Sequence, residues 1–93
     1  MIYLLHFEQP LGTPRHQAQH YLGFVQGDEI TVEHRLAEHR AGWGAKITLA
    51  ANQRSIRYDV VRTFHGDRRE ERRLKNQKNL GRLCPICSQK KQR

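Results

Sequence analysis

Apolar residues gather in short runs along the first two thirds of the chain, and these runs predict a small sheet. The runs at 1–7 and 20–25 are rich in β-branched, aromatic and aliphatic residues and predict two strands, the first buried on both faces. A third run at 56–64 predicts another strand. The segment 8–19 carries two prolines and a glycine and is expected to be a loop. The first two strands should therefore pair as a hairpin with a long connection.

Helical spacing replaces the strand pattern in the middle of the chain. Val32 and Leu36 lie four residues apart, which predicts a helix over 30–41 that buries both side chains. Gly42 follows as the expected stop signal. Residues 45–54 include an alanine-rich stretch and are expected to form a second, short helix.

The last third of the chain begins with a helix start signal. Asp67-Arg-Arg-Glu70 matches a capping box and predicts a helix over 68–80 that buries Leu74. All these elements together predict an α+β domain over 1–80, with a small three-stranded antiparallel sheet flanked by helices. Residues 81–93 are expected to follow it as a basic C-terminal tail.

Charge points to a polyanionic partner. The chain of 93 residues has a net charge of +8, from 17 Lys and Arg against 9 Asp and Glu, and 11 of those cations lie between Arg62 and Arg93. Clustered cations release counterions from nucleic acid, which favours DNA or RNA as the partner. No apolar run approaches the roughly 20 residues of a membrane span, and the apolar start is too short for a signal peptide. We therefore expect a cytoplasmic protein with no membrane association.

Several short motifs occur in an informative order. They are Met1-Ile2-Tyr3, Tyr21-Leu22-Gly23, His34-Arg35-Leu36-Ala37-Glu38-His39, Gly42-Trp43-Gly44-Ala45-Lys46, Tyr58-Asp59-Val60-Val61 and Glu71-Arg72-Arg73-Leu74-Lys75. In this order and on these elements, they resemble the GIY-YIG nuclease superfamily, in particular its small stand-alone members. The resemblance covers about residues 1–80. It departs from the family pattern where Met1 replaces the first glycine and Leu22 replaces the second isoleucine.

The resemblance implies a divalent-metal-dependent endonuclease that hydrolyses DNA phosphodiester bonds, in a process such as repair or recombination. The implied catalytic residues are Tyr3, Tyr21, Arg35, His39 and Glu71. Glu71 would bind Mg²⁺ or Mn²⁺, because magnesium commonly takes one or two carboxylates together with substrate oxygens. The residues expected to contact DNA are Lys46, Lys75 and Asn79, where Asn76 is an alternative to Asn79 as the family's polar residue after the metal helix.

The chemistry of these side chains sets conditions on their roles. A tyrosine acting as general base at pH 7 must lower its pKa by about three units through nearby cations; otherwise the two tyrosines only position water and phosphate. Arg35 suits a bidentate phosphate contact, and His39 could take or relay a proton. The alternative reading is two core tyrosines, with Glu71 as a surface carboxylate paired with Lys75.

The pair Cys84-Pro-Ile-Cys87 is half of a zinc site by its spacing. Zinc requires four ligands, and the chain has no second cysteine pair, so His65, another histidine or a second chain would have to complete the site. Two reduced thiols in a basic tail are the favoured interpretation, and zinc is the alternative. A disulfide is disfavoured in the cytoplasm.

Two other functions remain open on the sequence. The chain could be a non-catalytic nucleic-acid-binding module with a GIY-YIG-like fold, or a small zinc-containing interaction protein. A homodimer or a partner protein could supply specificity, because the chain has no room for a separate target-recognition domain. For the nuclease, the five implied catalytic residues should converge on one concave surface. Arg35 and His39 are expected beside the apolar stripe of their helix, at the edge of the sheet.

Overall fold

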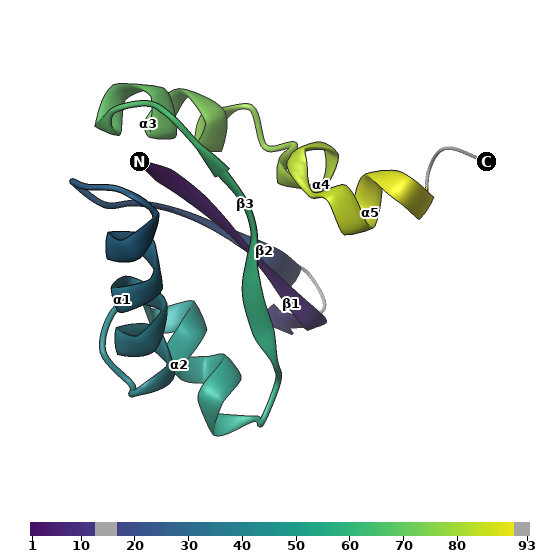
Figure 1. Ribbon diagram of the computed structural model, residues 1–93. Coiled ribbons are helices and arrows are strands. Elements are labelled where there is room, and N and C mark those ends of the chain that lie inside the picture. Colours follow the sequence, from purple (N-terminus) through teal and green to yellow (C-terminus); the bar gives the residue numbers. More distant parts are fainter. Residues whose placement is uncertain (13–16, 91–93) are drawn as a thin grey trace.

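The computed structural model describes residues 1–12 and 17–90 and has the predicted α+β architecture (Figure 1). Its elements are β1 (Ile2–Gly12), β2 (Gln17–Phe24), α1 (Glu29–Arg40), α2 (Lys46–Gln53), β3 (Tyr58–Phe64), α3 (Arg68–Asn76), α4 (Leu80–Leu83) and α5 (Pro85–Lys90). The three strands form one antiparallel sheet in the order β2-β1-β3, which confirms the predicted fold class.

The central strand β1 supplies both apolar cores. Side chains alternate between the faces of a strand, so Tyr3, Leu5 and Phe7 lie on one face and Ile2 and Leu4 on the other. All five side chains are at most 2% exposed, as the sequence predicted for a strand buried on both faces. Helices α1 and α2 cover the first face, and α3, α4 and α5 lie on the second (Figure 1).

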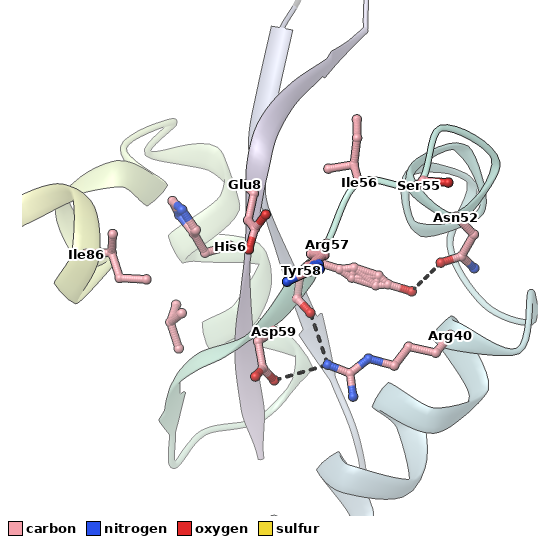
Figure 2. Close-up of a pocket in the computed structure, with 11 residues that line it drawn as sticks. His6, Glu8, Arg40, Asn52, Ser55, Ile56, Arg57, Tyr58, Asp59 and Ile86 are labelled. Atoms are coloured by element: carbon pink, nitrogen blue, oxygen red, sulfur yellow. Dashed lines mark hydrogen bonds and ion pairs between the residues drawn. The ribbon is translucent and has the colours of Figure 1, made fainter.

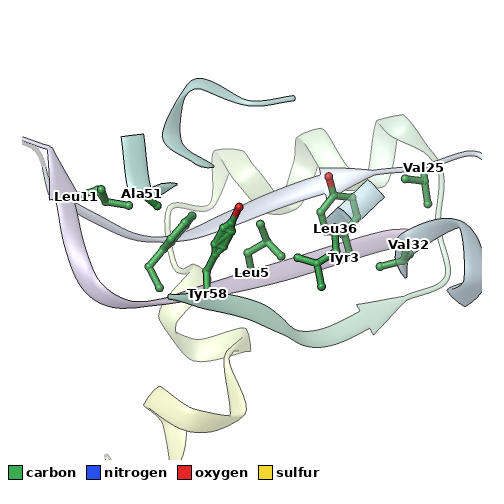
Figure 3. Packing of buried hydrophobic residues seen from close by; sticks show 9 residues of the cluster. Tyr3, Leu5, Leu11, Val25, Val32, Leu36, Ala51 and Tyr58 are labelled. Atoms are coloured by element: carbon green, nitrogen blue, oxygen red, sulfur yellow. The ribbon is translucent and has the colours of Figure 1, made fainter. Parts of the chain in front are cut away.

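The helices on the first face follow the prediction closely. Val32 and Leu36 of α1 and Ala51 of α2 pack against the Tyr3 face of β1 (Figure 3). Asp28 caps α1, because its carboxylate accepts hydrogen bonds from the backbone N–H groups of the second and third residues after it, at 3.1 and 3.2 Å. The bounds of α1 and α2 agree with the predicted helices to within one residue at each end.

The predicted loop at 8–19 is mostly strand, and this expectation was wrong. Strand β1 continues to Gly12, β2 begins at Gln17, and the four residues between them lie outside the described part of the chain. Pro10 is tolerated because it falls within a register irregularity between His6 and Leu11. Buried Leu11, 3% exposed, anchors this extension of β1. Leu11 belongs to the same apolar cluster as Ala51 of α2, so the first face is still covered near the end of β1.

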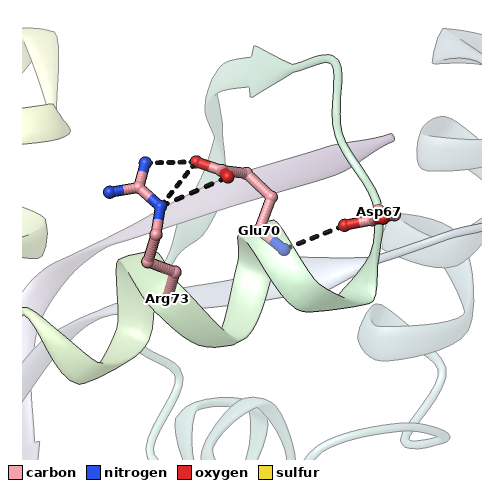
Figure 4. A network of polar contacts seen from close by, with 3 residues as sticks. All are labelled: Asp67, Glu70 and Arg73. Atoms are coloured by element: carbon pink, nitrogen blue, oxygen red, sulfur yellow. Dashed lines mark hydrogen bonds and ion pairs between the residues drawn. The ribbon is translucent and has the colours of Figure 1, made fainter.

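Helix α3 starts where predicted and ends earlier. Asp67 accepts a hydrogen bond from the backbone N–H of Glu70 at 2.9 Å, and the Glu70 carboxylate pairs with Arg73 (Figure 4). Helix α3 ends at Asn76 instead of continuing to residue 80, because Lys78 takes a left-handed conformation with φ of 53°.

The described part of the C-terminal segment contains two short helices. Helices α4 and α5 pack on the second face of the sheet, where Cys84 is fully buried beside Leu22 and Leu74. No helix was predicted for this segment, although Leu83, Cys84, Ile86 and Cys87 lie close together in the chain. In the described part of the chain, no helix is long and apolar enough to cross a membrane.

Candidate functional site

Strand register brings the two tyrosines together. Tyr3 pairs with Gly23 and Leu5 pairs with Tyr21 across the β1–β2 ladder, so the tyrosines are diagonal neighbours on the face covered by α1. Their ring centroids lie 6.3 Å apart. The residue opposite Tyr3 has to be small, because a Cβ at Gly23 would overlap the Tyr3 phenol. The glycine of Tyr21-Leu22-Gly23 therefore makes room for the other tyrosine.

His39 lies between these tyrosines and α2, and its protonation state follows from its neighbours. Its Nε2 is 2.8 Å from the Tyr3 hydroxyl and its Nδ1 is 3.0 Å from the Thr48 hydroxyl. The Thr48 hydroxyl donates its single proton to the carbonyl oxygen of Ala45 at 2.8 Å, so it accepts from Nδ1–H of His39. Nε2 is then unprotonated and accepts the hydrogen bond of Tyr3.

The backbone after α1 is shaped around the same imidazole. Gly44 has φ of +122°, and a Cβ there would overlap the His39 ring. His39 is 2% exposed. It is thus buried beneath the tyrosines, and the expectation that it lies at the edge of the sheet was wrong. Burial is tolerated because Tyr3 and Thr48 satisfy both ring nitrogens.

The environment of Tyr3 disfavours the ionised phenol, so Tyr3 cannot serve as the base by itself. Burial raises the pKa of Tyr3, as do Tyr21 and, more weakly, the carboxylates of Glu38 and Glu71, while Arg35 opposes the rise. The large reduction required for a tyrosinate at pH 7 does not occur in this structure. Burial lowers the pKa of His39, assisted by Arg35. The pair therefore rests as a neutral phenol donating to a neutral imidazole.

A hollow of about 260 Å³ opens over this pair and is called the tyrosine hollow below. It is lined by Tyr3, Tyr21, Phe24, Arg35, His39, Gly44 and Ala45. The Arg35 side chain is 41% exposed and lies 3.6 Å from the Glu38 carboxylate. Enclosed small-molecule sites usually measure roughly 300–1,000 Å³, so this smaller, open hollow suits one segment of a polymer.

Glu71 approaches the tyrosine hollow from the other side of the β2 edge without lining it. Its carboxylate is 2.9 Å from the Lys75 ammonium, which lies 5.3 Å from the centroid of the Tyr21 ring. The Glu71 side chain is only 15% exposed, unlike an ordinary surface carboxylate. Four of the five predicted catalytic residues thus share one hollow, and the fifth lies one lysine side chain away from Tyr21.

Lys46 and Asn79, which were also predicted to contact DNA, lie in different parts of the fold. Lys46 is exposed at the first turn of α2 and follows Ala45, which lines the tyrosine hollow. Asn79 precedes α4, and its buried Oδ1 has no hydrogen-bond partner among the described residues. Sequence reasoning missed Thr48. The only signal for it was a threonine at the start of an otherwise apolar short helix.

A second, larger hollow of about 640 Å³ lies beside β3 and shares no lining residue with the first (Figure 2). Its polar groups are largely paired within the protein. Arg40 binds the Tyr58 carbonyl at 3.1 Å and lies 3.5 Å from Asp59, while the Tyr58 hydroxyl donates to Asn52 at 2.9 Å. These pairs stabilise the junction of α1, α2 and β3, so we place the candidate chemistry in the tyrosine hollow.

The second face of the sheet holds another cluster, formed by His6, His20, Cys84 and Cys87 and called the His–Cys cluster below. One ligand atom from each residue lies within 4.8 Å of all the others, so the cluster could hold a metal ion. Burial lowers the pKa of His20, and His6 lowers it further. His65 is not a member, and the sequence had no pattern that singled out His6 or His20.

The structure thus brings together a tyrosine–histidine–arginine group on one face and a His–Cys cluster on the other. The first group contains residues selected from the sequence by resemblance, and the second was only half anticipated. Comparisons of the chain with known protein families, with curated proteins and with solved structures find no match.

Proposed function

We propose that this protein is a divalent-metal-dependent endonuclease of the GIY-YIG type that hydrolyses DNA phosphodiester bonds. The observation that carries the proposal is the 2.8 Å hydrogen bond between Tyr3 and Nε2 of His39, inside a hollow that Arg35 and Tyr21 also line. A core tyrosine needs only a satisfied hydroxyl. Here the phenol is joined to a titratable base beside a cation, which supports a role in proton transfer.

Tyr3 and His39 together provide a route for the proton of the attacking water. Because Tyr3 donates its proton to Nε2, its oxygen can accept a proton from a water in the tyrosine hollow. As that proton moves to Tyr3, the Tyr3 proton moves to His39, and the phenol stays neutral throughout. The hydroxide formed attacks phosphorus, and the bond to the leaving oxygen breaks. His39 is the base in this scheme and Tyr3 relays the proton.

Cations around the hollow suit the phosphate group. The half-exposed guanidinium of Arg35 can donate two parallel hydrogen bonds to phosphate oxygens. Lys46, which follows a residue lining the hollow, and Lys75, beside Tyr21, add positive charge near it. A DNA backbone lying across the hollow would therefore meet cations along its path.

Glu71 has the donor chemistry for the metal. It offers a hard carboxylate at the edge of the site, and magnesium typically combines one or two such groups with waters and phosphate oxygens. Its partner in the structure is the flexible Lys75 ammonium, so a cation of higher charge could compete for the same oxygens. When bound, Mg²⁺ or Mn²⁺ supplies charge neutralisation at the phosphate and stabilises the leaving oxygen.

An exposed aromatic side chain adjoins the hollow. Trp43 is 74% exposed and directly precedes Gly44, which lines the hollow. A large indole in water has few intramolecular contacts, and nucleobases stack on such surfaces with about 1–3 kcal/mol per base. In the proposed function, Trp43 would provide a stacking surface for an unstacked base next to the cleaved phosphate.

The alternative function is a nucleic-acid-binding module without catalysis. The observation that favours it is the position of Glu71, which pairs with Lys75 and does not line the tyrosine hollow. In this reading the same cations bind the DNA backbone, and the Tyr3–His39 bond only stabilises the core.

Cleavage assays separate the two functions. Duplex, nicked, flapped and branched DNAs would be incubated with the protein and Mg²⁺ or Mn²⁺. We expect Glu71→Gln to lower cleavage by about 100-fold or more, the scale of lost transition-state charge stabilisation, with little change in DNA affinity. Glu70→Gln is the matched control, because Glu70 lies on the same helix but pairs with Arg73. Salt-sensitive binding without cleavage by the native chain would support the module, and full activity of Glu71→Gln would remove the metal role.

A further inference from the structure

We propose that the His–Cys cluster is a structural zinc site, which joins the C-terminal helices to the sheet face opposite the tyrosine hollow. Its ligands are Nδ1 of His6, Nε2 of His20 and the two sulfurs of Cys84 and Cys87. The site is independent of the proposed nuclease activity and concerns a different metal from the one proposed for Glu71.

The distances between the ligand atoms match a tetrahedron around one ion. Zn–N bonds of about 2.0–2.1 Å and Zn–S bonds of about 2.3 Å imply N–N separations near ~3.3 Å and N–S separations near ~3.5 Å. The two histidine nitrogens lie 3.3 Å apart. Three of the N–S separations are 3.5 Å for His6–Cys84, 3.8 Å for His6–Cys87 and 3.4 Å for His20–Cys87, and the remaining pairs lie within 4.8 Å. Apolar packing alone does not require four metal-binding atoms to lie around one point.

The backbone presents both ligand pairs without distortion. His6 and His20 are directly opposite each other on β1 and β2, in the last paired rung before the register irregularity. Cys84 is the extended residue that ends α4, and Pro85 then begins α5, so Cys87 returns toward the same point one turn later. The two-residue spacer between the cysteines is the usual spacing of a structural zinc pair.

The donor set favours zinc over other groups. Two thiolates and two imidazoles are too soft for magnesium or calcium and suit a tetrahedral zinc ion. In a Rieske two-iron centre the cysteines and histidines bind different irons. Here each sulfur lies within 3.8 Å of a histidine nitrogen, so both pairs surround one ion. Four protein ligands close the coordination sphere, which is typical of a structural site.

The fold supplies a reason for such a site. Helices α4 and α5 contain four and six residues, and isolated helices shorter than about 12 residues are marginal in water. They are held on the second face of the sheet by a small apolar group around Cys84. A zinc ion bound to both the hairpin and the α4–α5 junction would secure these helices and fix the register of β1 against β2.

The test measures zinc in the purified full chain. We expect about one Zn²⁺ per chain, and we expect Co²⁺ substitution to give the intense visible bands of a tetrahedral thiolate site. His20→Ala should lower zinc affinity by more than the roughly 10–100-fold typical of removing an outer-shell partner. His65→Ala is the matched control, because His65 is an exposed histidine outside the cluster.

Wild-type measurements keep the test decisive if His20→Ala does not fold. Zinc should protect both thiols of the native chain from alkylation, and chelation should expose them. A Co²⁺ spectrum of octahedral type, a Cys84–Cys87 disulfide in protein purified under reducing conditions, or equal zinc affinity in His20→Ala and His65→Ala would each overturn the proposal.

Discussion

The hydroxyl of Tyr3 lies 2.8 Å from Nε2 of His39, and this contact joins the central strand to α1. Thr48 binds the other imidazole nitrogen at 3.0 Å, so three elements fix the orientation of one ring. The neutral imidazole accepts the phenol proton, and the phenol oxygen remains available to the tyrosine hollow.

Removing the Tyr3 hydroxyl should stop cleavage without unfolding the protein. Tyr3→Phe leaves Nε2 of buried His39 unpaired, which should cost about 1–3 kcal/mol of stability. Loss of the proton relay should lower kcat by about 10²–10⁴-fold. The control is Tyr58→Phe, which removes a similar bond, from Tyr58 to Asn52 at 2.9 Å, outside the tyrosine hollow. Equal loss of activity in both variants would mean that only stability is affected.

Thr48 should act as a positioning residue through His39. Thr48→Val keeps the shape of the side chain but removes the acceptor for Nδ1–H, so the favoured tautomer loses its support. A loss of about 1–3 kcal/mol of hydrogen bonding corresponds to a decrease in kcat of about 5- to 160-fold. Thr48→Ser retains the hydroxyl and should retain the rate. Nitrogen chemical shifts of His39 would report the tautomer, and an unchanged tautomer in Thr48→Val would contradict this role.

The cleavage rate should fall at acidic pH, but only below the usual pKa of histidine. The groups that face His39 are Tyr3, Tyr21, Arg35, Glu38 and Thr48. Burial and Arg35 lower the His39 pKa and Glu38 opposes them, so the neutral base persists below pH of about 6.5. The rate should be level near pH 7 and fall only as pH drops through this lowered pKa.

The position of this acid limb can be checked without an activity assay. Arg35→Gln removes a nearby positive charge, so it should raise the His39 pKa measured by NMR titration of its ring. Glu38→Gln removes the opposing negative charge and should lower that pKa. Both variants replace a charged side chain with neutral glutamine, and their expected effects on the His39 pKa have opposite signs. Shifts in the same direction would show that the field at His39 comes from elsewhere.

Gly23 should tolerate no side chain. A methyl group there would overlap the Tyr3 ring, and overpacking of this kind usually costs about 1–3 kcal/mol. Gly23→Ala should therefore lower the thermal midpoint and displace Tyr3 from His39. Gly81→Ala is the control, because a Cβ there meets nothing within 4 Å. Alanine in α4 should leave stability equal or slightly raised. A native-like midpoint for Gly23→Ala would show that the ring can move without cost.

Local patterns were enough to predict most of the secondary structure. The spacing of Val32 and Leu36 predicted α1, and Asp67 marked the start of α3, because periodicity and capping depend on neighbours in the chain. The extent of the hairpin was missed, because Pro10, which lies within a register irregularity, looks like a loop residue in the sequence. The early end of α3 was missed too, since nothing near Lys78 signals a left-handed residue.

The sequence by itself determined the strands, the main helices and the residue types available for chemistry. Only the tertiary structure decided which of them meet. His39 is buried against Tyr3 because α1 packs across β1, and His6 meets Cys84 because α4 folds back onto the opposite face. These partners are separated by 36 and 78 positions along the chain. Contacts over such separations depend on strand register and helix packing, which no short stretch of sequence encodes.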